Sequence, residues 1–126
     1  MRRAFVVIVL AVVAASACQP PTFDLVTTPP TAPGQGRTCL MALNSGAIAG
    51  DIRDPSFVWL VQAGGRRVDL RWPFGLSVRF SPVAEVISLT GGVIVRDGDR
   101  VELGGGMVKG LFEICTVNGR DPLAGA

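Results

Sequence analysis

Side chains that could perform acid–base or nucleophilic chemistry are scarce in this sequence of 126 residues. It contains no histidine, which excludes Ser-His-Asp and Cys-His catalysis and removes a common metal ligand. The carboxylates of Asp51, Asp54 and Glu113 could support an acid-only enzyme if two of them met in a cleft. The sequence offers no other candidate for a catalytic role, so we predict that the protein is not an enzyme and binds neither cofactor nor metal.

The thiols are a second source of chemistry, because the sequence contains three cysteines, Cys18, Cys39 and Cys115. The lack of a CxxC pair and of histidine argues against a zinc site. An odd number of cysteines in an exported protein leaves one outside any intramolecular pair. Cys39 and Cys115 lie at the two ends of the segment that we expect to fold, so a disulfide between them would join the first strand to the last. In the chain-entropy account, closing this loop contributes about 4 kcal/mol.

Residues 1–17 have the pattern of an export signal. Two arginines precede an apolar run at 4–14, which is shorter than the roughly 20 residues needed to cross a bilayer. The following residues, Ala15-Ser16-Ala17-Cys18, resemble the lipobox of bacterial lipoproteins. The resemblance implies that Cys18 is the lipidated first residue of the mature protein, held by more than one acyl chain at the outer face of the cytoplasmic membrane. Ordinary cleavage at the same bond, which would leave a free thiol, is the alternative. Lipidation of Cys18 would leave Cys39 and Cys115 as a pair.

Two glycine-containing motifs are similar to parts of ligand-binding loops. Gly104-Gly105-Gly106 could cradle a phosphate, but it lacks the following Gly-Lys-Ser/Thr and a helix, so we expect a bulge that lets a strand turn a corner. Asp97-Gly98-Asp99 could begin a calcium loop, but the glutamate that closes such a loop is missing at the required spacing. We therefore interpret Asp97-Gly98 as a hairpin turn between strands at 93–95 and 101–103.

The most distinctive local motif is Trp72-Pro73-Phe74-Gly75. We interpret it as a β-turn in which the proline fixes φ and the aromatic rings cap the core. The alternative is an exposed binding lip, which makes Trp59, Trp72 and Phe74 candidate residues of a binding surface.

The elements that would position these residues are β-strands. Period-2 alternation or continuous apolar runs predict strands at 57–61, 67–72, 76–80, 93–95, 101–103 and 111–117. The first of these is apolar on both faces and is expected to be central. Gly64-Gly65 and Gly91-Gly92 predict turns, and no window has a helical period beyond short turns near 44–52 or 82–85. The sequence thus predicts one all-β domain at 37–117, a small antiparallel barrel or sandwich with one disulfide.

The segments on either side of this domain are predicted to be unstructured. Residues 18–36 comprise the lipidated cysteine and a Pro/Thr-rich disordered tether, which we expect to be extended and to reach about 50 Å. Phe23, Leu25 and Val26 interrupt the tether, and the sequence leaves open whether they dock on the domain. Residues 118–126 are predicted to be a flexible tail.

The net charge of the mature chain argues against nucleic acid as a partner. Removing residues 1–17 takes away two arginines and leaves ten basic and ten acidic residues, so no basic patch is expected to bind nucleic acid.

Part of the sequence resembles small uncharacterised secreted or lipid-anchored proteins of GC-rich, actinomycete-type bacteria. The resemblance is carried by the run from Gly91 to Gly106, the preceding Trp-Pro-x-Gly turn and the late Cys115. That resemblance covers 57–115 and implies no activity.

We therefore expect a cell-envelope lipoprotein that acts by binding another envelope protein or a small ligand. An exposed apolar patch would favour a protein partner, and a deep pocket with convergent polar groups would favour a small ligand. The alternatives are a structural or accessory envelope protein without a pocket and the acid-only enzyme described above.

Overall fold

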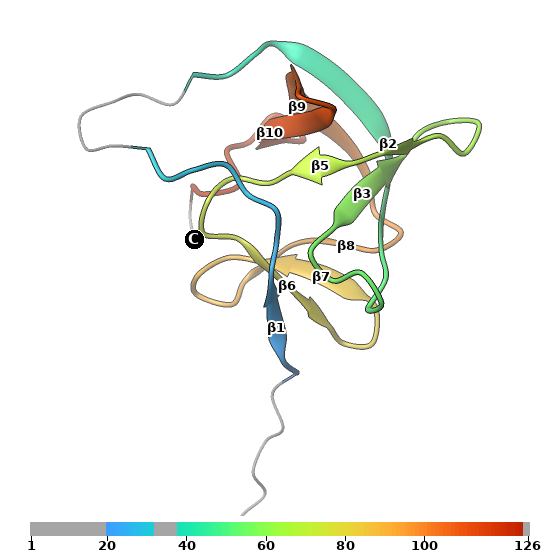
Figure 1. Cartoon of the computed structure of the whole chain (residues 1–126), viewed down its shortest axis with the longest axis vertical. Coiled ribbons are helices and arrows are strands. Elements are labelled where there is room, and N and C mark those ends of the chain that lie inside the picture. Colours follow the sequence, from blue (N-terminus) through green and yellow to red (C-terminus); the bar gives the residue numbers. More distant parts are fainter. Residues whose placement is uncertain (1–19, 32–37, 125–126) are drawn as a thin grey trace, which may run out of the picture.

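The computed structural model describes residues 20–31 and 38–124, and Figure 1 shows their arrangement. The described residues form ten strands and no helix. The strands are β1 (Thr22–Asp24), β2 (Ala42–Gly50), β3 (Val58–Val61), β4 (Arg67–Val68), β5 (Leu70–Arg71), β6 (Ser77–Phe80), β7 (Ala84–Ile87), β8 (Val93–Arg96), β9 (Arg100–Val108) and β10 (Leu111–Val117). They form a four-stranded and a six-stranded sheet around one core. The all-β prediction is confirmed, and the architecture is a sandwich.

The six-stranded sheet has the order β4-β3-β2-β9-β10-β5 and curls on itself. Its two edge strands are consecutive pieces of the segment predicted as one strand at 67–72, with only Asp69 between them. Val68 pairs with β3 at one edge, and Leu70 pairs in parallel with Phe112 at the other. The predicted alternation is correct, since Val68 and Leu70 are both buried. The strand is divided because one segment serves both edges of the curled sheet.

The four-stranded sheet has the order β1-β6-β7-β8, and its first strand comes from the segment 18–36. The prediction of a disordered tether is therefore wrong for residues 20–31. Phe23 pairs with β6, Leu25 is buried in the core, and the amide of Val26 donates to the carbonyl of Ser56 at 3.0 Å. The three apolar residues that interrupt the tether thus dock on the domain.

The prolines of this segment do not prevent pairing, because they flank the strand. Pro20 and Pro21 precede β1, and Pro29 and Pro30 follow its continuation. β1 is also an edge strand, where proline and its neighbours are tolerated because the outer backbone groups need no partner strand. The remainder of the predicted tether lies outside the described residues.

The core lies between the two sheets and takes side chains from both. Val78 and Val86 come from the four-stranded sheet, and Leu60, Leu103 and Phe112 come from the six-stranded sheet. Each of these side chains is at most 2% exposed. Burial of an apolar side chain of this size contributes about 1.5–3 kcal/mol, so the contact between the sheets is the main source of stability.

The turn at Asp97-Gly98 does not make the predicted hairpin. β8 pairs with β7 in one sheet, whereas β9 pairs with β2 and β10 in the other. The amide of Asp97 donates to the carbonyl of Ala84 at 2.8 Å, and the amide of Gly98 donates to the carbonyl of Ile48 at 2.7 Å. These bonds hold the turn against both sheets, so it carries the chain from one sheet to the other.

Besides β1, two strands, β2 and β7, are not predicted by the sequence pattern. β2 consists largely of small residues with low β-propensity. A Cβ at Gly46 would collide with the carbonyl of Val61, and one at Gly50 would lie 2.7 Å from the Cβ of Ala84. Close packing therefore requires glycine here. β7 is buried along its whole length, at a place where only a short turn was expected.

The other predicted turns are confirmed. Gly64 and Gly65, with φ of 87° and 86°, join β3 to β4 in an antiparallel hairpin. Gly91, with φ of 87°, lies in the turn between the paired strands β7 and β8. Positive φ is readily adopted by glycine alone, which explains why these dipeptides are reliable signals.

Residues 118–124, predicted as part of a flexible tail, begin in a turn that is hydrogen bonded to β9. The amide of Asn118 donates to the carbonyl of Glu102 at 2.8 Å, and the Asn118 side-chain oxygen accepts from the amide of Glu102 at 2.9 Å. Pro122 is buried. The described domain therefore extends past its predicted end at 117.

Candidate functional site

The predicted disulfide is confirmed: Cys39 and Cys115 are bonded, with their Cα atoms 5.9 Å apart. The adjoining part of β10 contains a bulge, because Ile114 and Thr116 lie opposite successive residues of β9. Cys115 is the extra residue between them and is released from the regular ladder to meet Cys39. The bulge that we predicted at 104–106 thus lies in the partner strand, and β9 continues through the glycines.

The three glycines form a flat floor next to the disulfide. A Cβ at Gly104 would collide with the hydroxyl of Thr116, and one at Gly106 would collide with the side chain of Leu40. Side chains from both neighbouring segments therefore lie directly on the backbone of β9. This close approach is the physical reason for glycine in the motif, and it requires no phosphate.

An open groove of about 560 Å³ lies on this floor. It is lined by 39–43 together with Gly104, Cys115, Thr116 and Asp121, and we call it the disulfide groove. Its apolar side chains are strongly exposed: Leu40 by 53%, Met41 by 97% and Leu43 by 68%. Several exposed apolar side chains around one concavity are typical of an interaction surface.

The exposure of these side chains follows from the pairing of β2. Residues 47–50 of β2 pair with β3, whereas the earlier part of the strand, 42–46, pairs with β9 alone. Leu43 lies opposite Gly104, which has no side chain to cover it. The beginning of β2 therefore presents apolar side chains that no other described strand buries.

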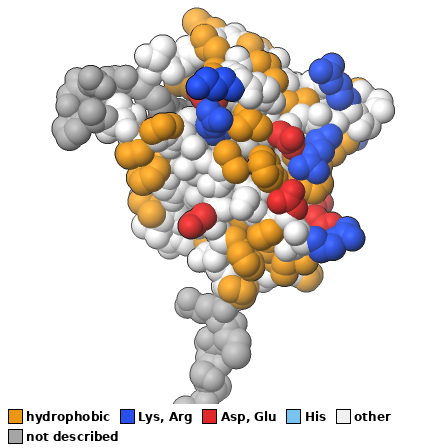
Figure 2. Space-filling model, in the orientation of Figure 1, with side chains coloured by type: hydrophobic (Ala, Val, Ile, Leu, Met, Phe, Trp, Pro, Cys, Tyr) orange, Lys and Arg blue, Asp and Glu red, His pale blue; other side chains and the backbone are white. Residues whose placement is uncertain are grey.

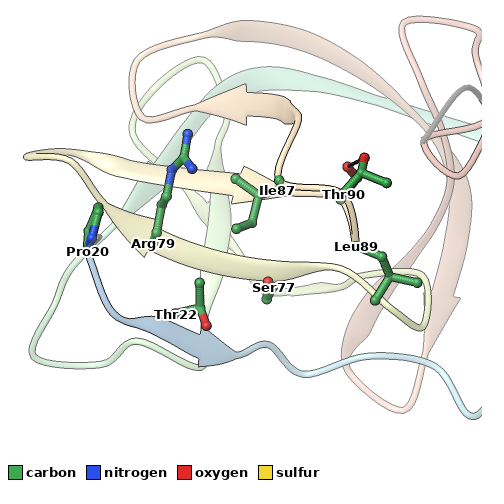
Figure 3. A pocket seen from close by; sticks show the side chains of 9 residues that line it. Pro20, Thr22, Ser77, Arg79, Ile87, Leu89 and Thr90 are labelled. Atoms are coloured by element: carbon green, nitrogen blue, oxygen red, sulfur yellow. Dashed lines mark hydrogen bonds between the residues drawn. The ribbon is translucent and has the colours of Figure 1, made fainter. Parts of the chain in front are cut away.

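A second pocket, also of about 560 Å³, is polar. Figure 3 shows it over β1 and β6, with Thr22, Ser77 and Arg79 directed toward it from these strands and Thr90 from the turn between β7 and β8. Some of its polar groups are already engaged within the domain. The hydroxyls of Ser88 and Thr90 are hydrogen bonded at 3.0 Å, and the Nε of Arg79 donates to a neighbouring carboxylate.

That carboxylate belongs to Glu85, which is 4% exposed. Cross-strand register places Glu85 between Arg79 on β6 and Arg96 on β8. Each arginine donates from Nε to a different Glu85 oxygen. Hydrogen bonds from Arg96 and then from Arg79 hold the pKa of Glu85 below its usual range. A buried carboxylate requires such partners, so this cluster has a structural role in the four-stranded sheet.

The three aromatic residues predicted as a binding surface do not form one. Trp72 is fully buried and donates from Nε1 to the carbonyl of Val58 at 3.2 Å, so the prediction is wrong for this residue, which instead caps the core. Trp59 is partly covered by the guanidinium of Arg67, 3.9 Å from the ring centroid. Only Phe74 projects freely from its turn, with 53% of its surface exposed.

Two of the three candidate catalytic carboxylates, Asp51 and Glu113, are paired with arginines. An oxygen of Asp51 lies 2.6 Å from Nη2 of Arg53, and an oxygen of Glu113 lies 3.0 Å from Nη1 of Arg71. Hydrogen bonds from Arg53 lower the pKa of Asp51 to about 2, so it is ionised at neutral pH and cannot donate a proton. Within 20–31 and 38–124, no group of three or more His, Cys, Asp or Glu side chains could hold a metal ion.

The carboxylates of the Asp97-Gly98-Asp99 motif bind backbone amides. An oxygen of Asp97 accepts from the amide of Gly50 at 3.2 Å, and an oxygen of Asp99 accepts from the amide of Arg96 at 2.8 Å. Both bonds stabilise the crossing between the sheets, so the motif is explained by the fold.

Cys18 lies outside the described residues, and its lipidation stays a prediction. Among the residues that the structure describes, no helix is long and apolar enough to cross a membrane. Comparison with protein-family models, with curated proteins and with solved structures found no match to this chain.

Sequence reasoning missed the disulfide groove. A signal for it exists in the run Cys39-Leu40-Met41-Ala42-Leu43, which is apolar without the alternation of a half-buried strand. Such a run suits either a buried strand or an exposed apolar surface, and only the pairing of β2 distinguishes the two.

Proposed function

We propose that this protein is a non-enzymatic binding module, anchored to the outer face of the bacterial cytoplasmic membrane through lipidated Cys18, that binds another envelope protein through the disulfide groove. The observation that carries this proposal is the exposure of Leu40, Met41 and Leu43 around the groove. Burying an apolar side chain of this size contributes about 1.5–3 kcal/mol, and this free energy is not gained while the three side chains stay in water. A protein partner that covers them recovers this free energy.

The chemistry of the groove favours a protein over a small polar ligand. Its lining is dominated by aliphatic and thioether side chains, and methionine is flexible enough to adapt to an irregular partner surface. The polar pocket is the rival site, but the hydroxyls of Ser88 and Thr90 and the Nε of Arg79 already bond within the domain. A small ligand would therefore have to displace existing hydrogen bonds there.

The rigid surroundings of the groove also favour binding. The disulfide fixes Cys39 against β10, and β9, with its glycine floor, is packed closely beneath the groove. Apolar side chains held on a preorganised frame lose less conformational entropy when a partner covers them.

The anchor is tested separately from the groove. Cells that express the full chain should incorporate a fatty-acid probe into the protein, and Cys18→Ala should abolish that labelling. Unchanged labelling of the Cys18→Ala variant would refute the lipoprotein proposal.

The groove is tested by site-specific photo-cross-linking in cells. A photoreactive amino acid at position 41 should give a discrete protein adduct, and the same group at position 89, which is also strongly exposed, should not. The adduct should disappear when Leu43→Asp is added, while the thermal unfolding temperature stays unchanged because Leu43 is exposed. Equal cross-linking from both positions, or an adduct that survives Leu43→Asp, would contradict the proposal and favour an accessory protein without a docking site.

A further inference from the structure

The spacing between the anchor and the first strand has a consequence for how the domain sits. β1 begins at Thr22, only four residues after Cys18. At 3.3–3.6 Å per residue, this connection spans at most about 14 Å. A domain of about 100 residues has a radius of gyration of about 13 Å and is therefore about 33 Å across. The connection is less than half of this diameter, so it restricts which end of the domain can meet the lipid.

From this geometry we infer that the end of the domain at which β1 begins rests on the lipid surface, with the disulfide groove directed away from it. The inference depends on the proposed anchoring through Cys18. A short connection replaces the expected 50 Å tether, because residues that would have formed the tether are hydrogen bonded into the four-stranded sheet.

The residues at this end suit contact with lipid headgroups. Thr22 pairs with Arg79 near the end of β6, so the β6–β7 turn at 81–83 lies beside the start of β1, as Figure 1 shows at the lower end of the molecule. The loop that follows β2 reaches the same end. Val83 of the turn is 45% exposed, and Ile52 of the loop is 59% exposed. Figure 2 shows hydrophobic side chains gathered at this lower end.

The charges at this end largely neutralise one another, which indicates what kind of lipid is needed. Asp51 is paired with Arg53, and Glu85 is paired with both Arg79 and Arg96. No cluster of unpaired basic side chains is present there among the described residues to select anionic lipids. The anchor and the exposed aliphatic groups therefore favour contact with a zwitterionic surface as well.

The groove lies too far from the anchor to reach the membrane. β2 runs along the molecule from the groove, where Ala42 is part of the lining, to Gly50, which lies against Ala84 at the lower end. The eight residue steps from Ala42 to Gly50, at about 3.3 Å each, separate these ends by at most about 26 Å. This distance is roughly twice the reach of the connection from Cys18, so the groove faces the space outside the membrane.

The orientation can be measured by depth-dependent fluorescence quenching. We would place the mature full-length chain on phosphatidylcholine vesicles that carry a nitroxide on the acyl chain near the headgroup. Val83→Trp introduces a probe at the proposed contact, and Met41→Trp is the matched control at the groove. Both variants retain Trp59 and Trp72, so these contribute the same background. Val83→Trp should be quenched several-fold more than Met41→Trp, and equal quenching of the two would overturn the orientation.

Failure of the anchor and failure of the orientation remain distinguishable. If the purified chain carries no lipid, it will not sediment with the vesicles, which refutes the proposed anchoring. The Cys18 thiol is then coupled to a maleimide lipid, and the same pair of tryptophan variants is compared. Equal quenching of Met41→Trp and Val83→Trp would refute the orientation, whether the chain is held by its own lipid or by the maleimide lipid.

Discussion

Leu25 provides the sharpest test of the finding that the supposed tether belongs to the fold. The side chain is 7% exposed and is part of the core cluster. Leu25→Ala removes most of an aliphatic side chain and leaves a cavity, and such changes cost about 2–5 kcal/mol in protein cores. Because Leu25 lies beside a short edge strand that can partly collapse onto the site, we expect a loss near the lower end, about 3 kcal/mol.

This loss is large for a domain of this size. Domains of about 100 residues are stable by roughly 5–15 kcal/mol, so one substitution in the Pro/Thr-rich segment should remove a fifth or more of the total. The thermal midpoint should fall by roughly 12–24 °C, at 4–8 °C for each kcal/mol. The variant should still fold, because the disulfide and the contact between the sheets stay intact.

Urea unfolding followed by tryptophan fluorescence is the appropriate assay. Trp72 is fully buried and forms a bridge with Thr27, two residues from Leu25, so its emission reports on this region. Leu89→Ala is the matched control, since Leu89 is 86% exposed and surface changes usually stay within about 0.5 kcal/mol. A Leu25→Ala midpoint equal to that of Leu89→Ala would show that the segment does not pack on the domain.

Three further outcomes follow from the same structure. Reduction of the Cys39–Cys115 disulfide should lower the free energy of unfolding by about 4 kcal/mol in the chain-entropy account; two alkylatable thiols in the untreated mature domain would show that no bond forms. Asp51 should titrate with a pKa of about 2 in carboxyl-detected NMR, and Arg53→Ala should return it toward 3.8. Because the folded pKa is the lower one, the stability that this pair contributes is complete above about pH 4 and is lost as the pH falls toward 2. Gly105→Ala should prevent folding or strongly lower the thermal midpoint, since its Cβ would collide with the backbone of β10; an unchanged midpoint would show that the glycine floor is not tightly packed.

Local patterns predict the strands with a solvent-exposed face. Alternating residues at 76–80 and paired glycines at 64–65 each depend on short-range geometry, namely side-chain alternation and positive φ. The disulfide is also predictable, because counting cysteines and locating the ends of the strand-rich region require no knowledge of the topology.

The features that could not be predicted depend on contacts between distant segments. β2 contains alanine, glycine and serine in place of β-formers, and it is a strand because Gly46 and Gly50 allow β3 and β7 to approach. The turn at 97–99 has ordinary hairpin chemistry, yet its bonds to Ile48 and Ala84 carry it between the sheets. The groove follows from an incomplete pairing of β2, which no local pattern encodes.

Docking of Phe23, Leu25 and Val26 converts a linker into a strand. Under the proposed anchoring through Cys18, this conversion would change how the module meets its partner. A disordered tether with the expected reach of about 50 Å would let the groove face in any direction. With Cys18 as the proposed anchor, a connection of at most about 14 Å that joins a hydrogen-bonded strand would instead hold the groove up to about 26 Å above the anchored end. A partner whose complementary surface stands at that height above the membrane would then experience a high effective concentration, and other partners would be excluded by geometry. Three apolar residues in a Pro/Thr-rich segment would therefore set both the stability of the domain and the selection of its partner.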